Sequence, residues 1–215
     1  MTTHRALALS LIVLLAAPAL ARADEPDPRS VFIVGDSHVE MLGPMLTRRL
    51  EGAGARVLGH ESRRGWSTAR YRAAGDLGRL LEERGRPEVV IVCLGGNDRT
   101  SDPAEYAEEL RWIVDQARGA GAEEILWVGP ASSDASAGET AAATGARHER
   151  NASWQSELVP ALGVRWIDSR PVTLEHHGRD GIHFTRRGYS AWTDGVLSLL
   201  PRALPAVVAG EDASA

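Results

Sequence analysis

The stretch Val31-Phe-Ile-Val-Gly-Asp-Ser-His38 decides the fold. Its first four residues are apolar, a glycine closes the run, and the polar residues Asp36 and Ser37 follow. Apolar side chains at consecutive positions are typical of a strand that is covered on both faces, as in a parallel sheet. We therefore predict a buried strand over 31–35 that presents polar side chains at its carboxyl end.

Short apolar runs of this kind recur along the rest of the chain, with helical segments between them. Further strand-like runs lie at 56–58, 88–94, 124–128 and 164–167, and apolar residues fall at helical spacing within 41–50, 77–81, 106–114, 139–158 and 186–200. Pro44 interrupts the first helical segment, and we expect the main part of that helix to begin there. Strands that alternate with helices predict an α/β fold, a flavodoxin-like three-layer α/β/α sandwich around a five-stranded parallel sheet.

Length and composition indicate one globular domain. The chain has 215 residues, of which 43% are hydrophobic and 25% charged, as is usual for such a domain. We place the domain at 31–200, between a leader at 24–30 and a loose tail at 201–215. The Ala-, Ser- and Gly-rich stretch 131–145 is expected to form a flexible loop at the edge of the sheet.

The first 23 residues have the pattern of a secretory signal peptide. A positively charged start is followed by the apolar stretch Ala6–Leu20 and by the small-x-small site Ala21-Arg-Ala23. An apolar stretch of this length is short for a membrane anchor, which is the alternative. We expect cleavage after Ala23, a secreted or periplasmic location, and no stable membrane insertion after cleavage.

Charge and residue types exclude several functions. Cleavage would remove Arg5 and Arg22 and no acid, which takes the formal net charge from −5 to −7, so we expect no nucleic-acid partner. All 24 basic residues are Arg, which excludes lysine Schiff bases and the standard phosphate-binding loop. Cys93 is the single cysteine and is expected in the core. His176 and His177 lack supporting ligands, so no metal site is predicted.

Four polar segments lie at the edge where open α/β sheets bind ligands, beyond the carboxyl ends of the strands. The segments are 36–38, 63–67, 95–98 and 180–183. Together they supply a hydroxyl, a glycine amide, a carboxamide and an Asp–His pair, which is the set that acyl transfer through a serine requires.

The chemistry of that reaction suggests a role for each group. The hydroxyl of Ser37 is a weak nucleophile and needs a base, which His183 provides near neutral pH. Asp180 can hold the imidazole in the required tautomer. The oxyanion formed on attack needs donors, and the N–H groups of Ser37 and Gly65 and the side-chain amide of Asn97 are the candidates.

At this point the sequence resembles a known family. The ordered set Gly-Asp-Ser, Gly, Gly-x-Asn-Asp and Asp-x-x-His is similar to the four blocks of the SGNH hydrolases, the GDSL-like esterases, from Val31 to about Leu200. The resemblance implies the three-layer fold, a serine-ester mechanism without metal or other cofactor, and the same roles for these five residues. His38 replaces the usual Leu of the first block. In this it resembles the SGNH domains of membrane acyltransferases that O-acetylate bacterial glycans.

Purely structural roles are the alternatives at each position. Ser37 is a common helix N-cap, and Asn97 lies in a turn-forming sequence. Asp180 and His183 are alternative caps of the last helix, beside Thr185.

The expected substrate is a small ester, most simply an acetyl group on a carbohydrate, because the chain lacks long apolar lid segments. Thioesterase and lysophospholipase activities stay open. The alternatives are a glycan O-acetyltransferase that uses the same serine and a non-catalytic glycan-binding domain, and the intact set of catalytic residue types speaks against the latter. Trp66 is a candidate to line the acyl or sugar pocket, and packing in the core is an equal alternative.

Overall fold

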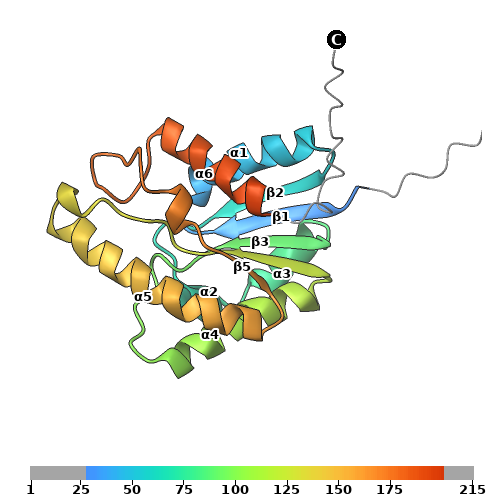
Figure 1. The fold of residues 1–215 in the computed structure, drawn as a ribbon. Coiled ribbons are helices and arrows are strands. Elements are labelled where there is room, and N and C mark those ends of the chain that lie inside the picture. Colours follow the sequence, from blue (N-terminus) through green and yellow to red (C-terminus); the bar gives the residue numbers. More distant parts are fainter. Residues whose placement is uncertain (1–27, 201–215) are drawn as a thin grey trace, which may run out of the picture.

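A single parallel sheet forms the centre of the protein. The computed structural model describes residues 28–200, and its five strands lie in the order β2-β1-β3-β4-β5 (Figure 1). The strands are β1 (Ser30–Gly35), β2 (Arg56–Ser62), β3 (Val89–Cys93), β4 (Glu124–Val128) and β5 (Arg165–Ile167). All four pairings are parallel. The predicted α/β fold with a five-stranded parallel sheet is confirmed.

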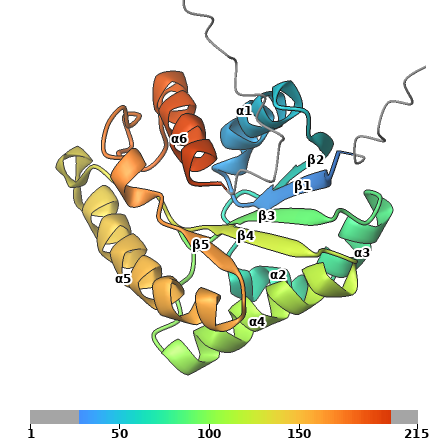
Figure 2. The same ribbon diagram turned by 45° about the vertical axis from the view of Figure 1, so that its right-hand side comes forward.

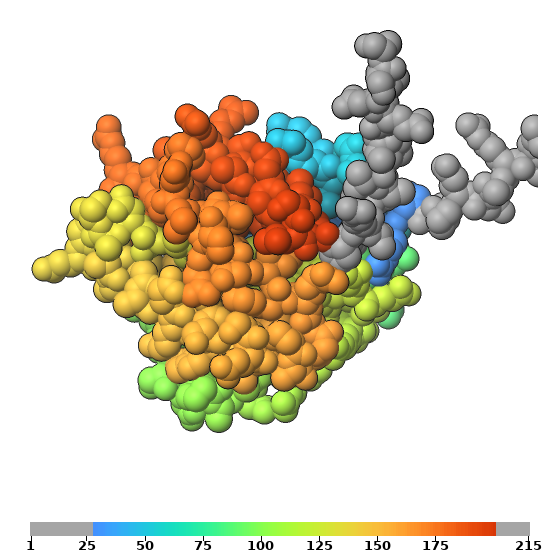
Figure 3. Space-filling model, viewed as in Figure 1, coloured from blue at the N-terminus to red at the C-terminus, as the bar shows by residue number. Residues whose placement is uncertain are grey.

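Helices cover both faces of the sheet. They are α1 (Val39–Gly52), α2 (Thr68–Ala74), α3 (Leu77–Glu83), α4 (Pro103–Gly119), α5 (Glu139–Ala161) and α6 (Arg186–Leu199), with the short 3₁₀ turns η1 (Ala135–Ala137) and η2 (Arg170–Val172). The two ribbon views place α1 and α6 on one face and α2 to α5 on the other (Figures 1 and 2). In the space-filling view α5, α6 and their connections hide most of the sheet (Figure 3).

The alternation of side chains along β1 divides the core in two. Val31 and Ile33 pack with residues of α1 and α6, whereas Phe32 and Val34 pack with residues of α2 to α5. All four side chains are fully buried. Successive residues of a strand face opposite sides, so a strand between two helical layers must be apolar at every position.

Three expectations about elements need correction. Helix α1 runs through Pro44 instead of beginning there. The proline removes one backbone hydrogen bond, but the helix still buries Leu42, Leu46 and Leu50 against the sheet, and this apolar burial outweighs the lost bond. Helix α5 begins at Glu139, so the expected loop is shorter than 131–145.

The third correction is α2, which has no counterpart among the predicted helices. It spans only seven residues and buries only Thr68 and Tyr71, too few for a periodic apolar signal. The predicted signal peptide and the tail lie outside the described residues. Within 28–200, no helix combines the length and apolar character needed to cross a membrane.

The order of the strands determines where a site can form. From β1 the chain moves outward to β2 and then returns past β1 to β3. The connections that leave β1 and β3 therefore run to opposite faces, which opens a crevice beyond their carboxyl ends. Ser37 follows β1 and Asn97 follows β3, so both lie at this crevice.

Candidate active site

Ser37 lies in the turn between β1 and α1. The strand ends at Gly35, where a Cβ would come within 2.3 Å of the Cys93 carbonyl oxygen on β3, so only glycine fits this close approach. The Oγ of Ser37 lies 3.0 Å from Nε2 of His183. The N-cap of α1 is His38, which makes no side-chain capping bond. Ser37 therefore does not cap the helix, and its hydroxyl faces the imidazole.

Asp180 holds His183 from the other side of the ring. Its Oδ2 lies 2.7 Å from Nδ1 of His183, and its Oδ1 accepts the N–H groups of Ile182 at 3.0 Å and His183 at 2.9 Å. Partial burial opposes ionisation of the carboxyl, but these hydrogen bonds outweigh it and lower the pKa of Asp180 to about 2. Thr185 is the N-cap of α6, so neither Asp180 nor His183 serves as its cap.

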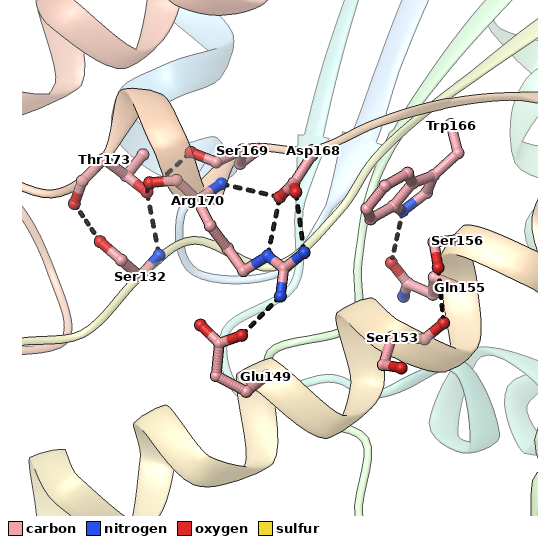
Figure 4. A network of polar contacts seen from close by, with 10 residues as sticks. All are labelled: Ser132, Glu149, Ser153, Gln155, Ser156, Trp166, Asp168, Ser169, Arg170 and Thr173. Carbon is pink, nitrogen blue, oxygen red and sulfur yellow. Dashed lines mark hydrogen bonds and ion pairs between the residues drawn. The ribbon is translucent and has the colours of Figure 1, made fainter.

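The connection that carries Asp180 and His183 is anchored at its start. Arg170 donates two hydrogen bonds of 2.8 Å to Asp168 and one of 2.5 Å to Glu149 on α5 (Figure 4). The N–H of Ser132 donates to Oγ1 of Thr173 at 2.9 Å. These contacts tie η2 to α5 and to the segment after β4, so the chain leaves β5 in a fixed direction.

A close backbone contact fixes the tip of the same connection. The N–H of Asp134 donates to the carbonyl of Gly181 at 2.7 Å. Gly181 has a φ of +66°, and a Cβ there would lie 2.6 Å from the carbonyl oxygen of Asp134 and 2.6 Å from Cβ of Ala137. Glycine is thus required both for the backbone conformation and for the space, and Asp180 beside it is placed by this docking.

The imidazole of His38 packs behind the ring of His183. The two ring centroids are 5.1 Å apart, and Nδ1 of His38 lies 3.1 Å from the hydroxyl of Tyr189. Burial, together with the nearby charge of His183, lowers the pKa of His38 to about 3. His38 is therefore neutral at ordinary pH, and its side chain makes no hydrogen bond with the Ser37 hydroxyl.

Two backbone donors lie free beside Ser37. Within the part of the chain that the structure describes, the N–H groups of Ser37 and Gly65 donate to no protein acceptor. Gly65 has a φ of +68° and no heavy atom within 4 Å of a Cβ placed on it. The left-handed backbone therefore explains why residue 65 is a glycine, and crowding of a side chain does not.

The third candidate donor is already engaged. Nδ2 of Asn97 donates to Oδ2 of Asp36 at 3.1 Å and to the carbonyl of Trp66 at 3.2 Å. An amide nitrogen carries two protons, so a contact with a bound oxyanion must share one of them. The turn that carries Asn97 is itself fixed by Asn151 of α5, whose Nδ2 donates to the carbonyls of Gly95 and Asp98 at 2.7 and 2.9 Å.

Asp36 is a site residue that the sequence reasoning did not single out. It is buried, and its Oδ1 accepts the N–H of His38 at 3.0 Å. Burial raises the pKa of Asp36 to about 7 against the effect of this hydrogen bond, and the buried carboxyl of Asp98 adds to the rise. Its only signal in the sequence is a charged residue directly after a fully apolar strand.

Trp66 lies beside the site but is packed against the protein. Its ring makes an edge contact with Tyr71 at 5.1 Å between centroids, and the guanidinium of Arg63 lies 4.4 Å from its centre. It also packs against the core on the α2–α5 face. Of the two alternatives for Trp66, this geometry supports packing, and its main contribution to the site is the carbonyl that accepts from Asn97.

Two hollows lie at the site, one lined by Ser37 and one by the candidate oxyanion donors Gly65 and Asn97. The first, of about 270 Å³, is lined by Ser37, His183, Met41, Phe184, Tyr189 and the ion pair of Glu40 and Arg64. The second, of about 470 Å³, lies past the oxyanion candidates and is lined by Gly65, Asn97, Arg70, Arg99, Glu105 and Glu109, among others. The side chain of His183 is 45% exposed, so reactants reach it without movement of a lid.

The structure offers no further ligand cluster in the residues it describes: no group of three or more His, Cys, Asp or Glu residues there has the geometry of a metal site. Cys93 is buried, and burial raises its pKa far above the usual thiol range.

This fold and this serine, histidine and aspartate arrangement define the class of α/β hydrolytic enzymes. A sequence model of the GDSL-like lipase/acylhydrolase family matches residues 33–191. The chain belongs to that family, whose members hydrolyse esters, and the predicted SGNH relationship is confirmed.

Solved structures share the fold at low sequence identity. A carbohydrate acetylesterase family member from Sinorhizobium meliloti aligns with a TM-score of 0.66 and 19% identity, over 82% of this chain and 98% of that one. The aryl esterase of M. smegmatis aligns with 0.60 and 23%, over 80% and 100%. A lipase/acylhydrolase from Enterococcus faecalis aligns with 0.61 and 19%, over 80% and 94%. No curated protein matches the chain.

Proposed function

We propose that the protein hydrolyses small carboxylic esters, most simply acetyl esters on carbohydrates, through an acyl-enzyme formed on Ser37. The observation that carries the proposal is the continuous hydrogen-bonded chain from Ser37 through His183 to Asp180, with contacts of 3.0 and 2.7 Å. A nucleophile, a base and a group that orients the base are thereby in place.

The first half of the reaction follows from this chain. Nε2 of His183 takes the proton as Oγ of Ser37 attacks the ester carbonyl, and the charge of Asp180 stabilises the imidazolium. The free N–H groups of Ser37 and Gly65 are the proposed donors to the oxyanion that forms, with Asn97 as a third donor. The imidazolium then protonates the departing alcohol, and the acyl group stays on Ser37.

The second half reverses the roles. His183 takes a proton from water, which attacks the acyl carbonyl, and the imidazolium returns the proton to Oγ of Ser37 as the acid leaves. One ester and one water thus give one acid and one alcohol.

The size and polarity of the site favour a small acyl group. Neither hollow is a long apolar channel, and both are rimmed by charged side chains. A fatty chain would leave its apolar surface in water. The names of the similar structures, a carbohydrate acetylesterase and an aryl esterase, support small esters as the first substrates to test.

Transfer of the acetyl group to a sugar is the second candidate. The observation that favours it is a second hollow at Gly65 and Asn97 in addition to the one lined by Ser37, which gives room for an acyl donor and an acceptor. A sugar hydroxyl would then replace water in the second half of the reaction.

Labelling and kinetics test the proposal together. A fluorophosphonate probe is expected to label the protein at Ser37 and to leave Ser37→Ala unlabelled. Ser37→Ala and His183→Ala are each expected to remove nearly all activity in a chromogenic ester series from acetyl to palmitoyl. The double variant should be little worse, because the two residues act as a unit.

Folding of each variant is checked by circular dichroism. A folded Ser37→Ala that hydrolyses acetyl esters at the parent rate would contradict the mechanism. If the parent cleaves no ester, an acetyl donor and a sugar acceptor decide between transfer and no catalysis, by the appearance of acetylated sugar.

A further inference from the structure

The hollow of about 470 Å³ beside Asn97 has a polar lining that hydrolysis of a simple acetyl ester does not use. Its volume is ample for a sugar-sized ligand, since small-molecule sites span roughly 300–1,000 Å³. It begins at two candidate oxyanion donors, Gly65 and Asn97, and extends to Arg70 on α2 and Arg99 in the turn after β3. Because Gly65 and Asn97 belong both to this hollow and to the candidate oxyanion hole, a sugar that extends from an ester at Ser37 past these donors enters the hollow.

Arg70 and Arg99 carry charges that the described protein does not neutralise. Neither has a carboxylate within ion-pair distance in residues 28–200. By contrast, Arg64 in the other hollow is paired with Glu40 at 2.6 Å. Arg70 donates only to the carbonyl of Gly65, at 3.3 Å, and both guanidinium groups are exposed.

A third arginine strengthens the positive charge behind Asn97. Nε of Arg147 on α5 donates to the carbonyl of Gly96 at 2.9 Å, one residue from Asn97. Burial lowers the pKa of Arg147, and repulsion from Arg99 and Arg150 lowers it further. The buried carboxyl of Asp98 offsets part of this repulsion, and an anion bound at Arg99 would relieve more of it.

The two carboxyl groups of the hollow are engaged with hydroxyls. Glu105 accepts from Thr100 at 2.8 Å and Glu109 accepts from Thr68 at 2.6 Å. Carboxylates have further acceptor positions, which suit the hydroxyl groups of a sugar. The guanidinium groups of the two arginines suit a carboxylate, and the carboxylates of the two glutamates accept hydrogen bonds from hydroxyls. Together they match a sugar that carries both a carboxylate and hydroxyls.

We infer that this hollow binds the carboxylate of an acidic sugar, so that the preferred substrates are O-acetylated acidic glycans. The inference rests on the proposed esterase function and specifies its substrate class.

The test compares two acetylated methyl glycosides that differ only in a carboxylate or a hydroxymethyl group on the sugar, a uronate and its neutral counterpart. The parent is expected to favour the uronate in kcat/KM by on the order of tenfold, the effect of one charge-assisted contact. Arg99→Gln is expected to remove most of that preference through a higher KM for the uronate, with kcat and the neutral substrate unchanged.

Arg48→Gln is the matched control. Arg48 is an exposed arginine on α1, on the opposite face of the sheet, and also lacks an ion pair among the described residues. It should keep the full preference. As a second measurement, free glucuronate should inhibit cleavage of an aryl acetate by the parent more strongly than glucose does, and Arg99→Gln should abolish the difference.

Equal kcat/KM for the two glycosides in a parent that cleaves aryl acetates would overturn the substrate class and leave the esterase proposal standing. An equal loss with Arg99→Gln and Arg48→Gln would overturn the role of the hollow. A parent that cleaves no acetyl ester would overturn both proposals.

Discussion

Asp36 is the residue on which the hydrogen bonds of the site converge, and its environment makes it sensitive to pH. Its pKa is about 7 in the folded protein against 3.8 when unperturbed, with burial as the main cause. The folded state therefore holds this proton more tightly than the unfolded state. The contribution to stability is complete below about pH 4 and is lost as the pH rises through about 7.

The variant Asp36→Asn tests this pH dependence. Its free energy of unfolding, measured in urea and taken relative to the parent, should rise between about pH 4 and pH 7, because Asn pays no ionisation cost. The loss of the Asn97 contact adds an offset that does not change with pH. Glu157→Gln, on the exposed face of α5, is the control. If the difference in the free energy of unfolding between Asp36→Asn and the parent did not change with pH, Asp36 would be ionised throughout this range.

The proposed role of Asn97 as an oxyanion donor depends on a single atom, its Nδ2. Asn97→Ala should keep the fold and lower kcat by about 10²–10³-fold, the usual effect of removing one oxyanion donor. KM should change little, because the contact forms mainly in the transition state. Steady-state kinetics on an acetyl ester give both constants. A normal kcat would show that the amide serves only Asp36 and the Trp66 carbonyl.

Sequence reasoning at this scale depends on position relative to the strands. Ser37, Asn97 and Gly65 could be found because each follows a strand end, and the structure brings them to one crevice. Asp36 and Arg99 were missed because each is one more charged residue in a polar stretch. Only the burial of Asp36 and the charge of Arg99 beside a hollow distinguish them, and both depend on tertiary packing.

At the scale of elements, the connection from η2 to α6 determines whether the site is assembled. Gly181→Ala should separate this connection from Asp134 and Ala137 and disturb the Asp180–His183 pair. We expect kcat to fall at least tenfold, in addition to a loss of stability of about 1 kcal/mol or more from the left-handed backbone.

Gly75→Ala separates the two effects. Gly75 has nearly the same φ, +67°, but no heavy atom lies within 4 Å of a Cβ placed there. It should lose similar stability from the backbone alone and keep its kcat. Equal kcat values for the two variants would show that the docking of Gly181 does not position the catalytic pair. Steady-state kinetics and urea unfolding supply the measurements.

The elements that the sequence predicted are those whose burial makes the pattern regular. Strand β1, buried on both faces, and α4, with its periodic apolar residues, were both found close to their observed bounds. Strand β2 extends to Ser62, beyond the predicted 56–58, because it is an edge strand whose polar end makes no apolar signal. The start of α5 at Glu139 agrees with the predicted segment 139–158, whereas α2 was missed because tertiary contacts, not local periodicity, define it.

At the scale of the whole molecule, one sheet separates two apolar clusters that share no helix. Leu46 on α1 belongs to one cluster and Ile113 on α4 to the other, and both side chains are fully buried. Leu46→Ala and Ile113→Ala should each lower the free energy of unfolding by about 2–5 kcal/mol. The double variant should show the sum within about 0.5 kcal/mol.

Urea unfolding followed by fluorescence and by circular dichroism checks this additivity. The two probes should give one coincident transition, because every strand contributes to both clusters. Two separate transitions, or a strongly non-additive double variant, would contradict a single cooperative unit.

Ser37 and His183 lie 146 positions apart in the sequence, and this separation sets the order in which the parts of the site are made during synthesis. The proposed nucleophile and its strand leave the ribosome first, and β2 to β4 can pair with that strand before the proposed base has been made. The segment that carries His183 and the final helix α6 follow last. On the proposed mechanism, a nascent or prematurely terminated chain that ends before residue 180 carries the nucleophile without its base, and it is expected to be inert toward esters.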